Sequence, residues 1–436
     1  MGGRVPPETV MKTFTPSLLI FLAERRKNME YGIEYLRGKL RSKSQRVNLR
    51  YKYYEMKNNV RKITALIPPE FKAVTYSLGW CGKAVDSIAD RMFFDKIEKD
   101  DFMLNEIYSQ NNADILFDSS ILSALISSCS FLYIDKDYDG YPTIECVDGG
   151  NATGIIDPVT NLLTEGYAVL KRADNGDPLL EAYSRPGETI YYENGKPTPV
   201  DVFTHKAPYA LLVPLIYRPD ARRPFGHSRI SRSCMDIVQC ALRTLLRTEV
   251  GAEFYSVPQK YIVGLAQDAE FNNKAATLST FLSFSKDDEG KVPSLGQFQQ
   301  QSMAPHIEHM RMLASMFAGE TGLTLDDLGF STDNPQSYDA IRASHEQLRL
   351  STRKGQRNFG VGFINAGYLA ACIRDDTAYE RRSFANARVS WAPIFEPDAS
   401  AIGAIGDAVY KINQAVPDFV GENTVHRLTG LESDAE

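Results

Sequence analysis

The sequence contains none of the short motifs that mark the common nucleotide-driven enzymes. It has no G-x-x-x-x-G-K-[ST] loop to hold phosphates, and Gly360-Val361-Gly362 lacks the rest of a dinucleotide-binding fingerprint. An HExxH zinc motif is also absent, and no Ser, His and Asp set can be singled out as a triad. These absences argue against an ATP-driven role and leave no marked catalytic centre.

Paired cysteines and long apolar runs are lacking as well. The six cysteines include no CxxC pair and lie in segments predicted to be helix or strand, which favours reduced, buried thiols. The longest early apolar run, Leu18 to Ala23, is six residues and is followed by four charged residues, so we expect neither a signal peptide nor a membrane span. We therefore expect a soluble protein that stays in the compartment where it is made.

Possible metal ligands are few and poorly grouped. His306 and His309 lie three apart on one predicted helix without an evident third ligand, so we expect them to be exposed or packed against polar groups. The run from Asp135 to Gly140 matches the first half of an EF-hand calcium loop, but its twelfth position is Cys146 and its flanks are predicted strands. A β-turn accounts for that run better than a calcium site does.

Asp326 and Asp327 form the one acidic pair that suggests a nuclease with two metal ions. No third acid and no lysine is grouped with them, and adjacent loop residues usually point apart. We therefore expect no catalytic residue, no metal and no cofactor.

Charge is divided unevenly along the 436 residues. The net charge is −6, yet residues 1–62 contain fifteen Lys or Arg and five Asp or Glu, a local excess of +10. This basic section is either a solvated helical surface or a locus for an anionic partner. Tyrosines interleave with its Lys and Arg residues, and they either stack on bases or anchor the helix to its neighbour.

The hydrophobic period divides the chain into segments. Residues 16–58, 76–91 and 101–128 have a helical pattern, whereas residues 130–217 alternate with period two in eight short runs separated by turn-formers. Regularly spaced hairpins predict an antiparallel β region rather than a Rossmann-like unit.

Two long helices are expected next, over residues 228–254 and 302–320, on either side of a small mixed insert that includes the strand QKYIVG and a helix over residues 272–281. They would run down and back up, holding the insert away from the main body. A strand is expected over residues 386–391, and a separate helical cap over residues 396–436.

Residues 302–357 read as helix, loop and helix. The first helix carries an apolar stripe that we expect to be buried, formed by Met303, Ile307, Met310, Ala314 and Phe317. The second starts at Asn334-Pro335 and is expected to continue to about residue 373. Its charged side chains form one strip: Arg342, Glu346, Arg349, Arg353 and Arg357. An apolar helix, a loop and a basic helix in series suggest a loop presented to a polyanion.

An ordered series of segments resembles the portal proteins of tailed double-stranded DNA bacteriophages, of the siphophage type. The series is RYKYYEMKNN, GWCGKAVDSIADRM, PLIYRPDARRPFGHSRI, EFYSVPQKYIVG, GETGLTLDDLG, NPQSYDAIRASHEQLRLSTRKGQRNFG and TVHRLTGLE. The resemblance covers nearly the whole chain, and it is carried by the order of the segments rather than by any single motif.

The resemblance implies an α+β portal fold that assembles as a ring, usually of twelve subunits, around a channel. Residues 1–226 would form the wing, 227–254 and 302–321 the two stem helices, 255–301 the clip and 322–336 the tunnel loop. Residues 337–395 would return to the wing, and residues 396–436 would form a short crown.

The implied function is that of a non-enzymatic gateway through which double-stranded DNA is packaged and ejected. Asp326, Asp327, Thr332, Asp333 and Asn334 would lie at the channel, and Arg349, Arg353, Lys354 and Arg357 would contact DNA without sequence specificity or contact neighbouring subunits. The resemblance implies the terminase large subunit, the head–tail adaptor, and the major capsid and scaffolding proteins as partners, with no membrane. The protein would occupy the capsid portal vertex of the virion, and the host cytoplasm during assembly. The alternatives are a metal-dependent DNA-processing enzyme and a monomeric virion adaptor.

Overall fold

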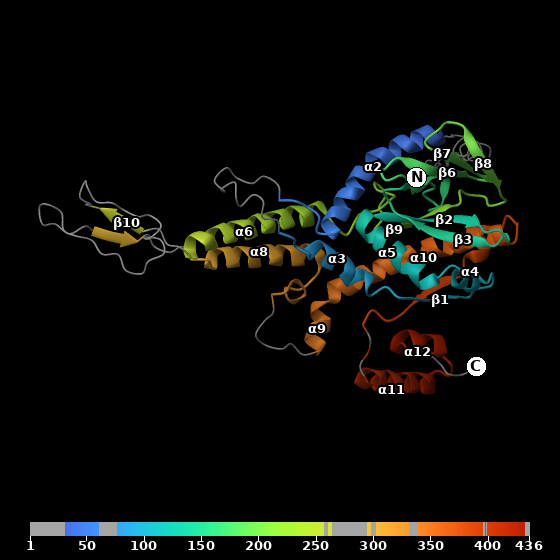
Figure 1. Cartoon of the computed structure of the whole chain (residues 1–436). Coiled ribbons are helices and arrows are strands. Elements are labelled where there is room, and N and C mark those ends of the chain that lie inside the picture. The colour runs from blue at the N-terminus through green and yellow to red at the C-terminus, as the bar shows by residue number, and fades with distance from the viewer. Residues whose placement is uncertain are drawn as a thin grey trace, which may run out of the picture. The chain divides into compact units, whose positions relative to one another are not determined.

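The computed structural model describes residues 31–60, 76–256, 260–263, 294–297, 302–330, 338–395, 397 and 399–431 (Figure 1). Both helices and strands are present, so the predicted α+β class is confirmed. The chain forms two compact units. The described residues within Met1–Leu49, Ala89–Ser228 and Thr352–Glu436 form the first, which we call the sheet unit. Those within Arg50–Ile88 and Arg229–Ser351 form the second, the helix-pair unit.

All eight predicted runs between residues 130 and 217 are strands of the sheet unit. They are β2 (Cys129–Lys136), β3 (Pro142–Val147), β4 (Ala152–Ile156), β5 (Leu163–Arg172), β6 (Pro178–Arg185), β7 (Glu188–Glu193), β8 (Pro199–Thr204) and β9 (Leu212–Ile216). Five form an antiparallel sheet in the order β4-β5-β6-β7-β8, and three form a second in the order β3-β2-β9. The alternating pattern therefore predicted both the strands and their antiparallel pairing.

The core of the sheet unit lies where its sheets meet. Side chains of both sheets, among them Phe131, Tyr133, Leu163 and Leu212, belong to one buried cluster. Strands β2 and β9 also contact helix α5 (Ala113–Ser127), which Figure 1 labels. Because partners contact both of its faces, β9 is buried along its whole length, as its continuous apolar sequence requires.

Helix α2 (Gly32–Tyr54) follows the outer edge of the five-stranded sheet. Lys39 Nζ donates to the carbonyl oxygen of Gly154 at 2.7 Å, and Ser44 Oγ donates to that of Gly150 at 2.9 Å. Between them, Lys43 Nζ reaches the carbonyl oxygen of Ala152 at 3.4 Å. A bare strand edge would present unpaired carbonyls, and here two lysines of α2 reach those of Ala152 and Gly154 in β4.

Two predicted helices are each interrupted by a polar residue that bonds to a neighbouring segment. The helix expected over 101–128 is split into α4 (Leu104–Gln110) and α5, because the side chain of Asn111 bonds the backbone of Ile107, Pro142 and Ile144. The helix expected from Pro335 to residue 373 is split at His345 into α9 (Tyr338–Ser344) and α10 (Glu346–Arg374). The predicted strip of charges is therefore divided between two helices.

Two strands were missed, and both are short. β1 (Phe94–Glu98) pairs with β12 (Arg388–Trp391), which matches the strand expected near residue 390. β11 (Ser294–Gln297) pairs with β10 (Lys260–Val263), the predicted strand QKYIVG. The helix expected over residues 272–281 lies outside the described residues.

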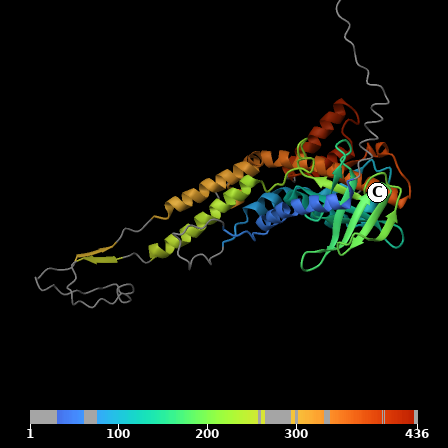
Figure 2. The same cartoon turned by 90° about the horizontal axis from the view of Figure 1, so that it is seen from above.

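The helix-pair unit is built on α6 (Arg232–Ser256) and α8 (Ala304–Thr321), which lie side by side in both views (Figures 1 and 2). Ser231 bonds Glu320 near one end, and Thr244 bonds His309 further along, so the two helices are antiparallel as predicted. Helix α3 (Trp80–Ala89) joins them through Trp80, whose ring centroid is 5.6 Å from that of Phe317.

The apolar stripe predicted on α8 is buried over only part of its length. Ala314 and Phe317 are fully buried, as expected, but Ile307 is 63% exposed, so its predicted burial is wrong. Met312 and Met316 on the same helix are about half exposed. The interior of the described chain therefore covers only part of the apolar surface of α8.

Helices α11 (Ala399–Ala415) and α12 (Glu422–Thr429) occupy the segment expected to be a helical cap. No residue of α11 is buried, and Tyr410 and Ile412 are among its exposed side chains. Within the described residues, no helix is both long and apolar enough to cross a membrane.

Candidate nucleic-acid interface

The loop that follows α8 begins with a tight helix end. Gly322 has φ +69°, a left-handed conformation that favours glycine, and its N–H donates to the carbonyl oxygen of Ala318 at 2.7 Å. Leu323, which precedes the short 3₁₀ helix η2 (Asp326–Leu328), and Leu328, the last residue of η2, are both buried. The first part of the predicted tunnel loop is thus anchored by apolar side chains.

Thr324 and Asp327 cap this turn reciprocally. The Asp327 carboxylate accepts hydrogen bonds from the backbone N–H and the hydroxyl of Thr324, both at 2.9 Å, and Thr324 Oγ1 accepts the N–H of Asp327 at 3.2 Å. This is the arrangement of a capping box with aspartate in place of glutamate. The same carboxylate oxygen lies 3.1 Å from His345 Nε2, at the junction of α9 and α10.

These contacts determine the charge state of Asp327. Partial burial opposes ionisation, but the hydrogen bonds from Thr324 and the nearby His345 ring lower the pKa of the carboxyl below its ordinary value. Asp327 is therefore ionised, and its carboxylate stabilises the loop through these hydrogen bonds. Asp326, its neighbour, is exposed.

The other predicted loop residues, Thr332, Asp333 and Asn334, lie outside the described residues. The assignment of all five loop residues to a DNA channel stays a prediction. The structure adds that Asp326 is exposed, whereas the Asp327 side chain is 20% exposed and is bonded within the loop.

Helix α10 carries the predicted basic residues. Arg349 is paired with Glu346 one turn earlier through Nε–Oε2 and Nη2–Oε1 contacts of 2.7 and 2.6 Å. Arg353, Lys354 and Arg357 are exposed and have no ion pair within the described part of the chain. Three of the four predicted cations are thus available to an anionic partner, while Arg349 is already engaged.

The basic section near the amino terminus serves partly internal contacts. Besides their bonds to the strand edge, Lys39 and Lys43 lie over the ring of Phe225, and Lys43 also lies 4.8 Å from the centroid of the Phe131 ring. Burial, with the adjacent Lys43, lowers the pKa of Lys39. Two of the fifteen positive charges that suggested an anionic partner therefore hold α2 against the sheets.

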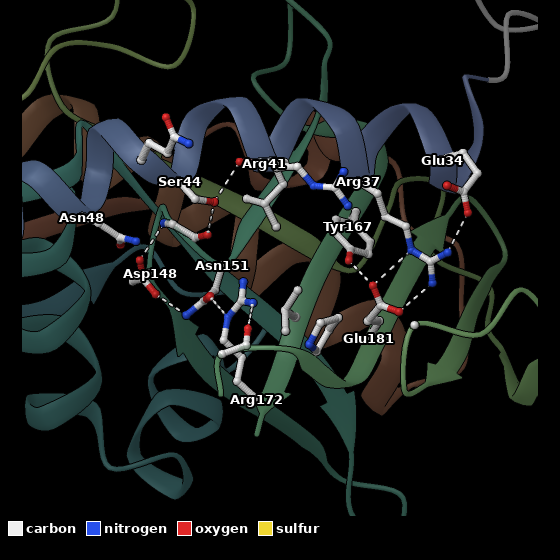
Figure 3. A pocket seen from close by; sticks show the side chains of 17 residues that line it. Glu34, Arg37, Arg41, Ser44, Asn48, Asp148, Asn151, Tyr167, Arg172 and Glu181 are labelled. Atoms are coloured by element: carbon white, nitrogen blue, oxygen red, sulfur yellow. Dashed lines mark hydrogen bonds and ion pairs between the residues drawn. The ribbon is translucent and has the colours of Figure 1, made fainter. Parts of the chain in front are cut away.

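A hollow of about 730 Å³ lies between α2 and strands of the five-stranded sheet (Figure 3). At one end Arg37 bonds Glu34 and the buried Glu181, which also accepts from the Tyr167 hydroxyl. At the other end Asn151 links Asp148 to Arg172. Most of the charged groups that line this hollow bond to one another or to Asn151. They therefore hold α2 to the sheet and are not available to bind a ligand.

The described residues contain no group of three or more His, Cys, Asp or Glu side chains placed to hold a metal ion. The run from Asp135 to Gly140 forms the turn between β2 and β3, where Asp137 accepts the N–H groups of Asp139 and Tyr141. His309 is packed against the Thr244 hydroxyl. The predicted β-turn is therefore confirmed, and His309 is packed against a polar group as expected.

The chain is similar in sequence to phage portal proteins. The portal protein of Mycobacterium phage L5 is 25% identical over 342 residues, which cover 73% of this chain and 69% of the relative. That of Mycobacterium phage D29 is 26% identical over 340 residues, with the same coverage. No family model matches the sequence. The predicted resemblance to portal proteins is confirmed by these two relatives.

Solved structures give more distant likenesses. A chain in the virion of a native gene transfer agent particle has a TM-score of 0.41 and 12% identity, over 81% of this chain and 90% of that one. An HK97-family phage portal protein from Corynebacterium diphtheriae has a TM-score of 0.36 and 11% identity, over 75% of this chain and 94% of that one.

Proposed function

We propose that this protein is the portal subunit of a tailed double-stranded DNA phage. The observation that carries the proposal is the sequence similarity to two curated portal proteins across 73% of the chain. In this role it forms a non-enzymatic ring at one capsid vertex, through which DNA enters and leaves the head.

Surface composition supports an assembled state. Ile307 and Met316 on α8 and Tyr410 on α11 are each more than half exposed in the single chain. Apolar side chains that recur along one element indicate a surface that another protein covers. In a closed ring the same surface of every subunit meets the next copy, so each is covered by its neighbour.

We assign the segments as the resemblance implies. Residues 1–226 and 337–395 are the wing, residues 227–254 and 302–321 are the stem and contain most of α6 and all of α8, and residues 255–301 are the clip. Residues 322–336 are the tunnel loop and residues 396–436 the crown. The antiparallel α6–α8 pair, with β10 and β11 at the end of α6 and the start of α8, supports this assignment.

We propose that each subunit makes a few weak contacts with DNA and that every subunit of the ring repeats them. Arg353, Lys354 and Arg357 of α10 occur once per subunit, so a ring would present them as circles of positive charge that attract phosphates, whereas Asp326 would form a circle of negative charge that repels them. Many weak phosphate contacts hold DNA without sequence preference and without stopping its movement.

Native mass spectrometry of the purified protein tests the proposal. We expect one discrete oligomer, with a dodecamer as the specific expectation. A protein that stays monomeric under all assembly conditions would favour the alternative of a monomeric virion adaptor. Cleavage of DNA with Mg²⁺ or Mn²⁺ would instead support the alternative of a metal-dependent enzyme.

A further inference from the structure

A second hollow, of about 300 Å³, lies between the two long helices of the helix-pair unit. Its lining consists of Cys240, Arg243 and Arg247 from α6 and of His309 and Leu313 from α8. We call it the α6–α8 hollow. Arg243 and Arg247 are one helical turn apart and therefore project from the same side of α6.

The two guanidinium groups have no anionic partner within the described residues. Arg243 is partly buried, and its hydrogen-bond partner is Cys240 Sγ at 3.0 Å, a weak acceptor. Arg247 is exposed and makes neither a hydrogen bond nor an ion pair in the described part of the chain. No carboxylate lines the hollow. Two positive charges thus converge on a cavity that contains no described counter-charge.

The orientation of His309 follows from Thr244. The Thr244 hydroxyl is within hydrogen-bond distance of two atoms, the carbonyl oxygen of Cys240 and His309 Nδ1, at 3.0 Å each. His309 is therefore bonded through Nδ1 to Thr244, and which atom donates is set by the tautomer of the ring. Thr244 is buried, which protects the pair from competing water. The ring is therefore held with its Nδ1 committed to the protein and its Nε2 available.

We propose that the α6–α8 hollow binds a phosphate group, held by Arg243 and Arg247 and bordered by His309. A guanidinium presents a planar fork of N–H donors that matches two oxygens of one phosphate, and two such groups supply a bidentate contact each. The phosphate is either part of a nucleic-acid backbone or a free phosphate or polyphosphate. The site is inferred from its own side chains and does not depend on the proposed portal role.

Calorimetric titration of the intact protein with inorganic pyrophosphate tests the site. The double variant Arg243→Gln/Arg247→Gln loses the charge-assisted hydrogen bonds of both guanidinium groups, so it should bind at least about tenfold more weakly. The matched control is Arg232→Gln/Arg311→Gln, which removes two exposed arginines from the same two helices outside the hollow. An equal loss in both double variants would overturn the site, since it would reflect net charge alone.

The alkylation rate of Cys240 reports whether a ligand occupies the α6–α8 hollow. Its thiol lines the hollow and is partly exposed, as is that of Cys146 in the sheet unit. Saturating pyrophosphate should slow the alkylation of Cys240 and leave that of Cys146 unchanged, as measured by mass spectrometry. If a short DNA duplex also protects Cys240 from alkylation, the ligand is a phosphate of a nucleic-acid backbone. If pyrophosphate alone protects Cys240, the ligand is a free phosphate or polyphosphate. Protection by neither would overturn the site and leave the test of ring assembly unaffected.

Discussion

Asp326 and Asp327 are neighbours in the sequence with opposite surroundings. Asp326 is exposed, whereas the carboxylate of Asp327 accepts two hydrogen bonds from Thr324 and contacts His345. The spacing of Thr324 and Asp327 is visible in the sequence as a capping signal. His345 lies eighteen positions further along and could not have been paired with Asp327 without the fold.

This difference makes the two aspartates a matched pair for mutation. We expect Asp327→Ala to lower the free energy of unfolding by about 1–2 kcal/mol, the usual cost of losing a cap. Asp326→Ala should change it by less than about 0.5 kcal/mol, as exposed substitutions do. Denaturant unfolding of both variants measures the difference, and equal values would show that the capping contacts do not stabilise the loop.

The contribution of Asp327 should also depend on pH. Its pKa in the folded protein is lowered, so its stabilising effect is present above the pKa of the unfolded chain, near 3.9, and is lost as the pH falls through the folded value. The gap in stability between wild type and Asp327→Asn should therefore be largest near neutral pH and close in acid. A gap that widens in acid would contradict the assigned charge state.

At the scale of elements, α2 fastens the edge of the five-stranded sheet. Lys39 and Lys43 are half-buried and donate to carbonyl oxygens of β4, and removing a donor leaves its partly buried acceptor unsatisfied. We expect Lys39→Met/Lys43→Met to destabilise the protein by about 1–3 kcal/mol. Arg46→Met, on an exposed position of the same helix, is the control. Thermal unfolding compares the double variant with this control. Similar melting temperatures would show that Lys39 and Lys43 do not stabilise the contact between α2 and β4.

The sequence predicted elements best where one period ran without interruption. Residues 130–217 alternate regularly, and all eight predicted runs are strands. It failed where a single side chain decides the end of a helix, as Asn111 does by bonding Ile107, Pro142 and Ile144. β1 was missed because five residues carry little periodic signal and its partner β12 is remote in the sequence.

The candidate site was predictable in kind but not in detail. The sequence predicted acids in the loop after α8 and cations on the helix that follows, and the structure describes Asp326 and Asp327 in η2 and the basic residues on α10. The engagement of Arg349 by Glu346 follows from their helical spacing. The α6–α8 hollow was missed, because Arg243 and His309 lie on different helices that only the fold brings together.

At the scale of the whole molecule, we expect the exposed side of α8 to lie in the interface between neighbouring subunits of the proposed ring. Ile307 and Met316 contribute little to the interior, so Ile307→Lys/Met316→Lys should leave the unfolding free energy of the subunit within about 1 kcal/mol of wild type. A lysine at each position would face an apolar neighbour in the ring and oppose assembly. Native mass spectrometry of this variant should show the monomeric subunit in place of the oligomer. An unchanged oligomer would show that this side of α8 does not lie in the interface between subunits.

Single-particle electron microscopy of the purified protein tests the central claim most directly. The portal role predicts a closed ring with an axial channel, with the α6–α8 pairs of successive subunits arranged around it. Particles that are monomeric, or that associate without closing around a channel, would contradict the role.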